Sequence, residues 1–274
     1  LLGPSCDEEI RIVLIGKTGN GKSASGNTLL NRDAFSPGSG TAECNKARGT
    51  VHGQRIAVID TPGLFDTKYK ERDVLLKLKT CISMSAPGPH VFLIVIRLDR
   101  FTEEEQRSVE LIQQVFGDKA ADYSMVLFTY GEQLQDTPPE AFTSQSSKLT
   151  NIIQACDGRC HVFNNKDPSC SQVPQLLEKV ERTVQNNGGS YYTNEMIQEA
   201  ERAVQEAAGK FENASAENKR RAEEALKAKH KGEKLQSKLK ELERKYKMQA
   251  REKAEKKNKY IFPGLFLTAA EIGL

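Results

Sequence analysis

A glycine-rich segment near the beginning of the sequence has the residue types and spacing of a phosphate-binding loop. Residues 16–23 have the sequence GKTGNGKS, which matches the P-loop pattern GxxxxGKS, and they follow the apolar run IRIVLI at residues 10–15. In such a loop the glycines let the backbone wrap closely, so that successive N–H groups point at phosphate oxygens, and the next helix adds positive charge at its N-terminus. The lysine reaches the β- and γ-phosphates, and the serine hydroxyl ligates Mg²⁺.

An ordinary glycine turn is the alternative interpretation of this segment. The spacing, the Lys-Ser pair and the position between an apolar strand and a helical run at residues 24–30 all favour a P-loop. The sequence therefore predicts a site for a nucleoside triphosphate with Mg²⁺. The residues that we expect to hold the phosphates are Gly19, Asn20, Gly21, Lys22, Ser23 and Ala24, and Ser23 is also the first expected metal ligand.

A second motif follows the apolar strand at residues 55–59. Asp60 stands at the end of this strand and begins the sequence DTPG. An aspartate at a strand end can hold the water shell of Mg²⁺, and the N–H of Gly63 can contact the γ-phosphate. A plain β-turn is the alternative, since Asp, Pro and Gly suit turns, but the P-loop earlier in the sequence favours the nucleotide site.

The segment between the two motifs, residues 35–48, contains proline and glycine and has little periodicity. We expect a switch loop here, ordered only when the γ-phosphate and Mg²⁺ are bound. Such a loop supplies a threonine to the metal. Thr41 is the first choice for this ligand, and Thr50 is the second choice, which the pattern places in a strand instead.

Polar residues after two later strands are candidates for selecting the base. Thr129 and Glu132 follow the strand at residues 125–128, and Asn164 and Asn165 follow the strand at residues 161–163. Guanine selection needs a carboxylate, usually the aspartate of an NKxD loop, and here Glu132 would have to supply it without a lysine packed on the base. Either loop could instead hold ordinary surface residues. Ligands bind at the carboxyl ends of strands in such sheets, however, and both loops lie there.

The elements that must position these residues alternate between strands and helices. Short apolar runs rich in Val, Ile and Phe indicate strands covered on both faces. The predicted strands are residues 10–15, 56–59, 91–96, 125–128 and 161–163. Capping boxes at residues 102–105 and 137–140 predict helix starts between strands. The alternation predicts an α/β domain with a mostly parallel sheet flanked by helices.

The composition changes after the sequence NNGG at residues 186–189. From about residue 194 to 259 there is no proline and a dense mixture of Glu, Lys, Arg, Ala and Gln, which predicts a long charged helix or a helix pair. Its apolar seam is interrupted, so a coiled coil, a partner-binding helix and a helix packed on its own domain all stay open. We divide the sequence into residues 1–7 (disordered or left over from cloning), a nucleotide-binding domain at 8–188, a charged helical extension at 189–259 and an apolar tail at 260–274. The tail is shorter than the roughly 20 residues of a membrane span.

The bulk composition excludes some functions. The net charge of +3 is too small to indicate nucleic acid binding or strong membrane attraction. The six cysteines are scattered through a chain long enough to fold without disulfides, which favours a reducing, cytoplasmic setting. Cys156, Cys160 and His161 lack the second ligand pair of a typical zinc site, and we recognise no signal peptide.

Taken together, these motifs resemble the GTPases of immunity-associated proteins, the GIMAP family, which is related to septins and chloroplast-import GTPases. The resemblance covers residues 8–185 and rests on RIVLIGKTGNGKSASGNTLL, IDTPGLFDT and above all FTEEEQRSVELIQQVFG, which is similar to the family's signature helix. The loops TYGEQL and FNNK resemble the family's base-binding loops, in which a Thr-x-x-Asp/Glu pattern binds guanine. The resemblance implies a P-loop GTPase domain that binds GTP or GDP with Mg²⁺, a helical extension, and GTP-dependent dimerisation through the nucleotide face.

Hydrolysis is expected to be slow in the isolated chain. Small GTPases place a glutamine after the glycine of the second motif to orient water, whereas Leu64 and Phe65 follow Gly63 here. Arg100 is the predicted catalytic residue, because the resemblance implies that a matching arginine acts across a dimer, and such arginine fingers contribute about 10³–10⁵ in rate. Arg97 is the second choice, and an ordinary ion-paired arginine is the alternative.

The sequence therefore predicts a GTP/GDP-binding switch with slow, dimer-activated hydrolysis and GTP-dependent self-assembly. A scaffold or polymer subunit that binds GTP without hydrolysing it is one rival, favoured by Leu64 in the place of glutamine. A P-loop kinase is a second rival, which the DTPG glycine and the long switch-like loop disfavour. The expected location is the cytoplasm, and the resemblance adds contact with intracellular membranes through the C-terminal region.

Overall fold

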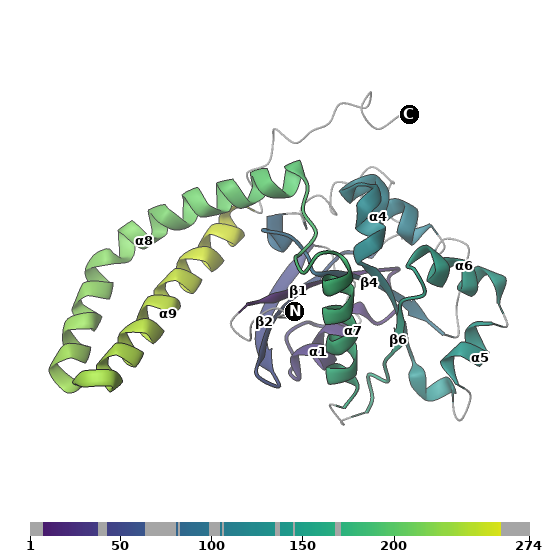
Figure 1. Cartoon of the computed structure of the whole chain (residues 1–274), viewed down its shortest axis with the longest axis horizontal. Coiled ribbons are helices and arrows are strands. Elements are labelled where there is room, and N and C mark those ends of the chain that lie inside the picture. The colour runs from purple at the N-terminus through teal and green to yellow at the C-terminus, as the bar shows by residue number, and fades with distance from the viewer. Residues whose placement is uncertain are drawn as a thin grey trace. The chain divides into compact units, whose positions relative to one another are not determined.

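The computed structural model describes residues 8–37, 43–63, 81, 83–98, 105, 107–134, 138–144, 146–167 and 171–258. The chain divides into two compact units, of which the first ends at Ile197 and the second begins at Gln198. The first unit contains a six-stranded sheet flanked by helices, and the second contains most of helix α8 and all of helix α9 (Figure 1).

The sheet has the strand order β2-β3-β1-β4-β5-β6. Its strands are β1 (Ile10–Ile15), β2 (Asn45–Val51), β3 (Gln54–Asp60), β4 (Val91–Arg97), β5 (Ser124–Thr129) and β6 (Cys160–Val162). Every neighbouring pair is parallel except β2 and β3, which form an antiparallel hairpin. The mostly parallel sheet predicted from the sequence is confirmed, and the carboxyl ends of β1, β3, β4, β5 and β6 meet at one edge.

Strand β2 corrects one expectation, because residues 35–48 were expected to form a loop. The strand begins at Asn45 and pairs along its whole length with β3, which gives its backbone a hydrogen-bonded ladder. Its side chains are mostly half-buried at the edge of the sheet, so the sequence NKARGTV has no apolar run to indicate a strand. Thr50 lies in this strand, as predicted. His52 and Gly53 both have positive φ, 49° and 82°, the geometry of a tight hairpin turn.

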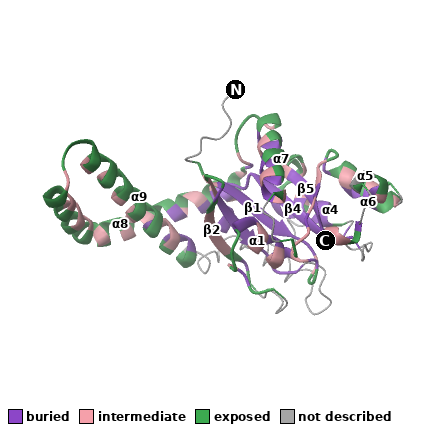
Figure 2. Ribbon diagram, turned by 90° about the horizontal axis from the view of Figure 1, so that it is seen from below, coloured by how far each residue is buried: buried purple, intermediate pink, exposed green. Residues whose placement is uncertain are grey.

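Helices cover both faces of the sheet. The first unit contains α1 (Lys22–Leu30), α4 (Ser108–Phe116), α5 (Pro139–Thr143), α6 (Ser147–Ala155), α7 (Gln172–Asn186) and the 3₁₀ helices η1 (Asp118–Tyr123) and η2 (Gly131–Leu134). Because side chains alternate along a strand, one face of the sheet packs in a core with apolar residues of α1 and α7. On β4, Phe92 meets Phe116 of α4 with ring centroids 4.6 Å apart. Figure 2 shows the buried residues concentrated in the strands of the sheet. Thr102 and Thr137, the predicted helix caps, lie outside the described residues.

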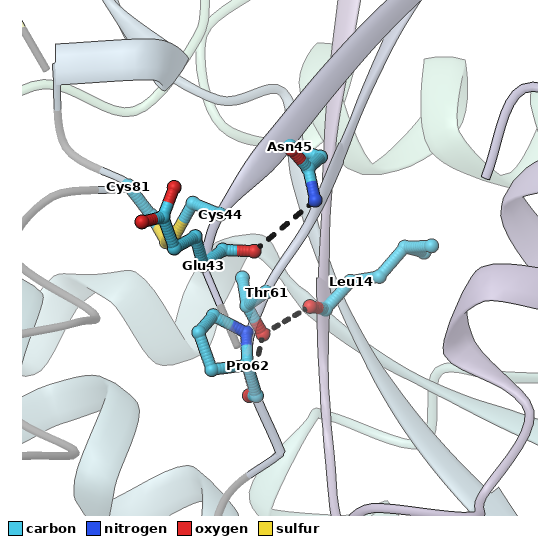
Figure 3. The surroundings of a disulfide bond; sticks show 7 residues. All are labelled: Leu14, Glu43, Cys44, Asn45, Thr61, Pro62 and Cys81. Atoms are coloured by element: carbon cyan, nitrogen blue, oxygen red, sulfur yellow. Dashed lines mark hydrogen bonds between the residues drawn. A yellow bond between two sulfur atoms is a disulfide. The ribbon is translucent and has the colours of Figure 1, made fainter. Parts of the chain in front are cut away.

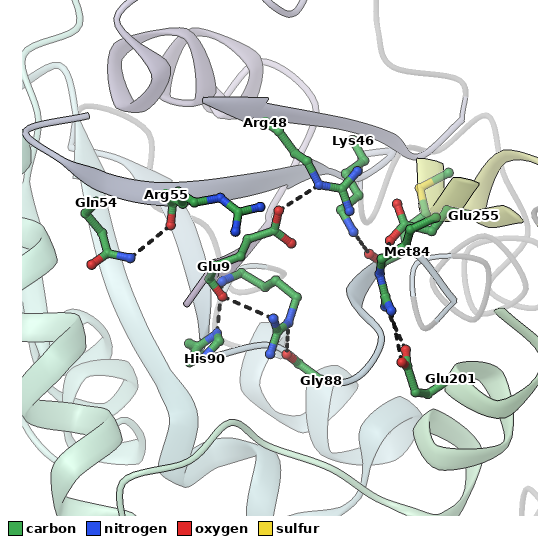
Figure 4. A network of polar contacts seen from close by, with 12 residues as sticks. Glu9, Lys46, Arg48, Gln54, Arg55, Met84, Gly88, His90, Glu201 and Glu255 are labelled. Atoms are coloured by element: carbon green, nitrogen blue, oxygen red, sulfur yellow. Dashed lines mark hydrogen bonds and ion pairs between the residues drawn. The ribbon is translucent and has the colours of Figure 1, made fainter. Parts of the chain in front are cut away.

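Polar contacts tie the amino end of β1 to its surroundings (Figure 4). The Arg48 Nε on β2 donates to a carboxylate oxygen of Glu9 at 2.7 Å, and the Arg11 N–H donates to Nδ1 of His90 at 2.9 Å. Burial, together with the nearby Arg11 guanidinium, lowers the pKa of His90 to about 3. His90 is therefore neutral at physiological pH, as a hydrogen-bond acceptor at this nitrogen must be.

A disulfide joins Cys44, directly before β2, to Cys81, in the segment before β4. This bond corrects the expectation that the cysteines are unpaired. The two residues are 37 positions apart in sequence and lie on either side of β3, so no short-range pattern marks them as a pair. In the folded chain their Cα atoms are 6.0 Å apart, which is an ordinary distance for a disulfide. Cys156 is a buried free thiol.

The second unit is a helical hairpin. Helix α8 (Glu195–Lys229) ends before His230, and α9 (Gly232–Asn258) starts at a glycine with φ of 59°. Near the open end of the hairpin, Arg251 of α9 forms an ion pair with Glu201 of α8 at 2.7 Å, so the two helices run antiparallel. The charged helical extension predicted from the sequence is confirmed as a helix pair. Among the described residues, no helix combines the length and the apolar character that a membrane span requires.

Candidate functional site

The P-loop lies at the carboxyl end of β1, as its sequence pattern predicts. Gly19 and Gly21 have φ of 87° and 90°, the left-handed conformation that favours glycine, and α1 begins at Lys22 immediately afterwards. The loop therefore curls around the N-terminus of α1, where the backbone N–H groups of the first turn and the helix dipole favour an anion. Ala24 lies in the first turn of this helix.

The Lys22 side chain reaches back across this loop. Its ammonium group donates to the carbonyl oxygens of Gly16 at 2.9 Å and Lys17 at 3.1 Å. Lys22 is only 5% exposed, and burial lowers its pKa to about 8, partly offset by the Asp60 carboxylate. A phosphate anion in the loop would compensate this buried positive charge, so the residue fits the role of phosphate ligand.

Two of the three predicted metal ligands lie together. The Ser23 hydroxyl at the start of α1 donates to Oδ2 of Asp60, at the end of β3, with an oxygen–oxygen distance of 2.6 Å. Asp60 is 1% exposed. A hydroxyl and a carboxylate beside a phosphate-binding loop form the hard oxygen donor set that Mg²⁺ prefers. Thr41, the third predicted ligand, lies outside the described residues.

Gly63 packs directly against the P-loop. A Cβ atom at this position would lie 1.8 Å from the Thr18 hydroxyl and 2.8 Å from the Thr18 backbone nitrogen, so no side chain fits here. The Thr61 hydroxyl donates to the carbonyl of Leu14 in β1 at 2.7 Å, which fixes the chain just before this glycine. The DTPG segment is therefore placed where the Gly63 N–H could sense a phosphate in the loop.

The first base loop is joined to the P-loop through its backbone. The hydroxyl of Thr129, at the end of β5, donates to the carbonyl of Asn20 at 2.7 Å. Glu132 lies beyond it in η2, where its carboxylate forms an ion pair with Lys166 at 2.9 Å. Lys166 belongs to the second base loop, so this ion pair links the two loops. No lysine was expected near the base, although Lys166 directly follows the two asparagines in the sequence.

The two asparagines of the second base loop have different surroundings. Asn165 Oδ1 accepts from the Thr28 hydroxyl at 2.8 Å, and its Nδ2 donates to the Ser25 hydroxyl at 3.2 Å, so this side chain faces α1. The Asn164 Oδ1 instead accepts from the backbone N–H of Lys166 at 3.0 Å and shapes its own turn. Asn165 therefore lies closer to the P-loop helix, and Asn164 holds the loop that presents it.

The two arginines predicted for catalysis have different outcomes. Arg97, the second choice, lies with its guanidinium carbon 3.9 Å from the ring centroid of Tyr130, in the first base loop. A cation–π contact of this kind stabilises both side chains, and it associates Arg97 with the base loop. Arg100, the first choice, lies outside the described residues, as do Leu64 and Phe65.

Glu105 makes a contact with the phosphate-binding loop that the sequence did not reveal. Its carboxylate, 1% exposed, accepts from the Asn20 amide at 2.6 Å, and the same amide donates to the carbonyl of Val95 in β4 at 2.9 Å. Glu105 belongs to the FTEEEQRSVELIQQVFG segment, where the sequence predicted only a helix-capping role for it. The structure shows that this segment contacts the phosphate-binding loop directly.

Comparisons with known proteins agree with this geometry. The model of the AIG1 family matches residues 10–212. GTPase IMAP family member 8 of Homo sapiens is 35% identical over 199 residues, which cover 69% of this chain and 30% of that protein. Immune-associated nucleotide-binding protein 9 of Arabidopsis thaliana is 38% identical over 201 residues, which cover 69% of this chain and 59% of that protein. The chain thus spans less than two thirds of the length of these relatives.

Solved structures show the same fold. Toc33 from Arabidopsis thaliana in complex with GDP and Mg²⁺ has a TM-score of 0.53 and 22% identity, covering 65% of this chain and 85% of that one. A second solved structure concerns the chloroplast translocon components atToc33 and psToc159, for which dimerization is stated to be important for the GTPase activity. It has a TM-score of 0.53 and 20% identity, and the match covers 65% of this chain and 84% of that one. At these identities the likeness establishes the α/β fold alone.

Proposed function

The chain belongs to the AIG1 family, and from this membership and the geometry of the site we propose that it is a GTP- and GDP-binding switch. The resemblance to the GTPases of immunity-associated proteins is confirmed by the family match and by the relatives named as such. The observation that most supports nucleotide binding is the convergence of Lys22, Ser23 and Asp60 at one end of the sheet, with Gly63 packed on the P-loop.

Each residue of the site has a role in this proposal. The backbone of Gly19–Ala24 and the Lys22 ammonium bind the phosphates, while Ser23, Asp60 and Thr41 hold Mg²⁺. When bound, Mg²⁺ neutralises charge on the phosphate oxygens. Gly63 reports the γ-phosphate through its N–H, because its backbone already contacts the P-loop. A relative named as a nucleotide-binding protein and a neighbour in complex with GDP and Mg²⁺ support this assignment.

Guanine selection is assigned to Glu132, with Asn165 presenting an amide from the neighbouring loop and Asn164 shaping that loop. In this proposal Glu132 exchanges its ion pair with Lys166 for the donor edge of the base. The test is displacement of a fluorescent guanine nucleotide from the protein. GDP should displace it and ADP should not, and Glu132→Ala should lose this preference while Lys22 still binds phosphates. Equal displacement by ADP would exclude guanine selection.

Hydrolysis is assigned to a dimer formed through the nucleotide face, in which Arg100 of one copy acts on the nucleotide of the other. The sequence supports this, since Leu64 cannot orient water as a glutamine does. The statement that dimerization is important for the GTPase activity of a structural neighbour also supports hydrolysis by a dimer. GTP turnover per molecule should rise with protein concentration, and Arg100→Ala should remove that rise, while ATP is ignored.

A scaffold that keeps GTP bound without hydrolysing it is the second proposal, favoured by Leu64. Its expected result is turnover near zero at every concentration, with GTP still bound. Location stays a proposal in either case: the protein would work in the cytoplasm, with its C-terminal region contacting intracellular membranes. Co-sedimentation of the full chain with lipid vesicles would test that contact, and protein left in the supernatant at every lipid concentration would exclude it.

A further inference from the structure

The disulfide between Cys44 and Cys81 is a covalent link beside the nucleotide site that the proposed function does not use. Both residues are buried, with exposed fractions of 1% and 0%, and their sulfur atoms are bonded to each other (Figure 3). The figure also shows Thr61 and Pro62 of the DTPG segment among the residues that surround the bond. A buried disulfide beside the DTPG segment restricts how far that segment can move.

The bond holds the start of β2 close to the proposed Mg²⁺ site. Asn45, the residue after Cys44, is the register partner of Asp60, whose carboxylate accepts from Ser23. A second contact joins the same two segments, since the Lys46 ammonium donates to the carbonyl of Met84 at 2.7 Å. The segment before β4 and the start of β2 are thus joined by two links, a covalent disulfide bond and a hydrogen bond that can exchange.

The bond also closes a loop around the nucleotide-sensing residues. The stretch from Cys44 to Cys81 contains β2, β3 and the DTPG segment with Gly63, which lies against Thr18 of the P-loop. While the bond is intact, the two ends of this stretch stay fixed to each other. Any rearrangement of DTPG that follows the loss of a γ-phosphate must then occur within a closed ring, whereas the reduced chain can separate its ends.

We propose that Cys44 and Cys81 form a thiol–disulfide modification site that regulates the nucleotide cycle. This inference rests on the proposed function. A low-molecular-weight disulfide is the oxidant: the thiolate of one cysteine attacks it, forms a mixed disulfide and releases one thiol. The second cysteine then displaces the other thiol and completes the protein disulfide. Two electrons leave the protein, and the two protons end on the two released thiols.

The oxidised protein turns over GTP more slowly than the reduced protein, because the closed ring restricts the DTPG segment and the strand that bears Asp60. Because both sulfurs are buried, a reductant reaches the bond only when the chain around Cys44 and Cys81 opens, and the disulfide is therefore reduced slowly.

The experiment compares the full chain after treatment with oxidised glutathione and after treatment with dithiothreitol. Maleimide labelling followed by mass measurement counts the free thiols, and the oxidised form should have two fewer, mapped to Cys44 and Cys81. GTP turnover should be at least about fivefold slower in the oxidised form, the lower end of typical coupling between sites. Cys44→Ser and Cys81→Ser should each abolish the difference, whereas Cys160→Ser, at a cysteine outside this pair, should keep it.

GDP binding to the reduced protein is measured first. Absence of GDP binding would overturn the proposed function. Turnover that is equal in both redox states, in a protein that does bind GDP, would overturn the redox site alone, as would two free thiols at Cys44 and Cys81 after oxidation. If either serine variant fails to fold, reduction and reoxidation of the unaltered chain give the same answer, since recovery of the slow rate on reoxidation must accompany loss of the two thiols.

Discussion

Charged side chains are used in opposite ways at the nucleotide edge of the sheet and along the helical hairpin. At the sheet edge, Lys22, Asp60 and Glu105 are all at most 5% exposed, and each has a specific hydrogen-bond partner outside its own helix or strand. Along the hairpin, Arg220 is 64% exposed and contacts Glu217 within the same helix. A buried charge that loses its partner is costly, whereas an exposed ion pair contributes little.

The difference indicates which charges hold a functional geometry and which solvate a helix. The hairpin contains one exception that tests this distinction. Arg251 is 29% exposed and contacts both Glu201 of α8 and Glu255 of its own helix. Because its partners are 14% and 5% exposed, this cluster resembles the sheet edge more than the rest of the hairpin. The substitutions below compare buried charges with exposed ones in both regions.

The largest effect is expected for Lys22→Ala. The variant loses charged hydrogen bonds to the β- and γ-phosphates, and such bonds contribute about 1.5–3 kcal/mol each, so affinity for a non-hydrolysable GTP analogue should fall by about 100-fold or more. Fluorescence titration with a labelled, non-hydrolysable GTP analogue measures the change. Lys238→Ala on α9 is the matched control, because this lysine is exposed and pairs with Glu241 of its own helix. A loss of affinity below about threefold in Lys22→Ala would contradict its role as phosphate ligand.

The second effect is expected in the hairpin. Arg251→Ala leaves the Glu201 and Glu255 carboxylates without their shared cation, and the stability of the paired helix ends should fall by about 2 kcal/mol. Amide hydrogen exchange in residues 198–204 and 247–255 measures it, because local opening reports local stability. Arg220→Ala should leave the exchange of its own region unchanged. Equal amide protection in Arg251→Ala and Arg220→Ala would mean that the buried ion pair of Arg251 stabilises the hairpin no more than an exposed ion pair does.

The third effect concerns the contact between Glu105 and the phosphate-binding loop. Glu105→Ala removes the acceptor from the buried Asn20 amide, and GDP affinity should fall by about tenfold as the loop loses its position. Glu105→Gln keeps an acceptor of the same length and should restore affinity to within about twofold of the unaltered chain. If the glutamine variant is as weak as the alanine variant, the charge of Glu105 matters and its position does not.

Sequence reasoning located those parts of the site whose residues are close together in the chain. The P-loop was identified from its local spacing, and β1 was predicted with the bounds Ile10–Ile15 that the structure shows. DTPG was recognised for the same reason. Two contacts between distant segments were missed, since Glu105 meets Asn20 across 85 positions and Cys44 meets Cys81 across 37. Ser23 and Asp60 are also 37 positions apart, but each lies in a recognised nucleotide-binding motif, whereas no motif pairs the two cysteines or joins Glu105 to Asn20.

The first part of β2, residues 45–48, was expected to be a loop for a different reason. β2 is stabilised by backbone pairing with β3 and is half-buried at the edge of the sheet, so its side chains need no apolar pattern. The turn between α8 and α9 is a middle case. Gly232 interrupts the apolar seam of the helical extension, and the structure places the reversal there, with φ of 59°. Local backbone requirements thus leave a trace in the sequence, while pairing at an edge does not.

The smallest effect is a pH dependence, which separates the buried lysine of the site from the exposed lysines of the hairpin. Burial lowers the pKa of Lys22 to about 8 in the nucleotide-free protein. A bound phosphate raises this pKa, so above pH 8 binding must take up a proton and affinity falls as the pH rises. GDP should bind about fourfold more weakly at pH 8.5 than at pH 7, as expected for one group with this pKa.

Isothermal titration at the two pH values, in buffers of different ionisation enthalpy, measures both the affinity and the proton uptake. Lys22→Ala should show neither the fourfold change nor the uptake, whereas Lys238→Ala should retain both. An affinity that is constant from pH 7 to pH 8.5 in the unaltered chain would mean that Lys22 stays charged without nucleotide. In that case the carbonyl oxygens of Gly16 and Lys17 and the carboxylate of Asp60 compensate its burial, and the buried charge at the sheet edge is stabilised by the fold itself.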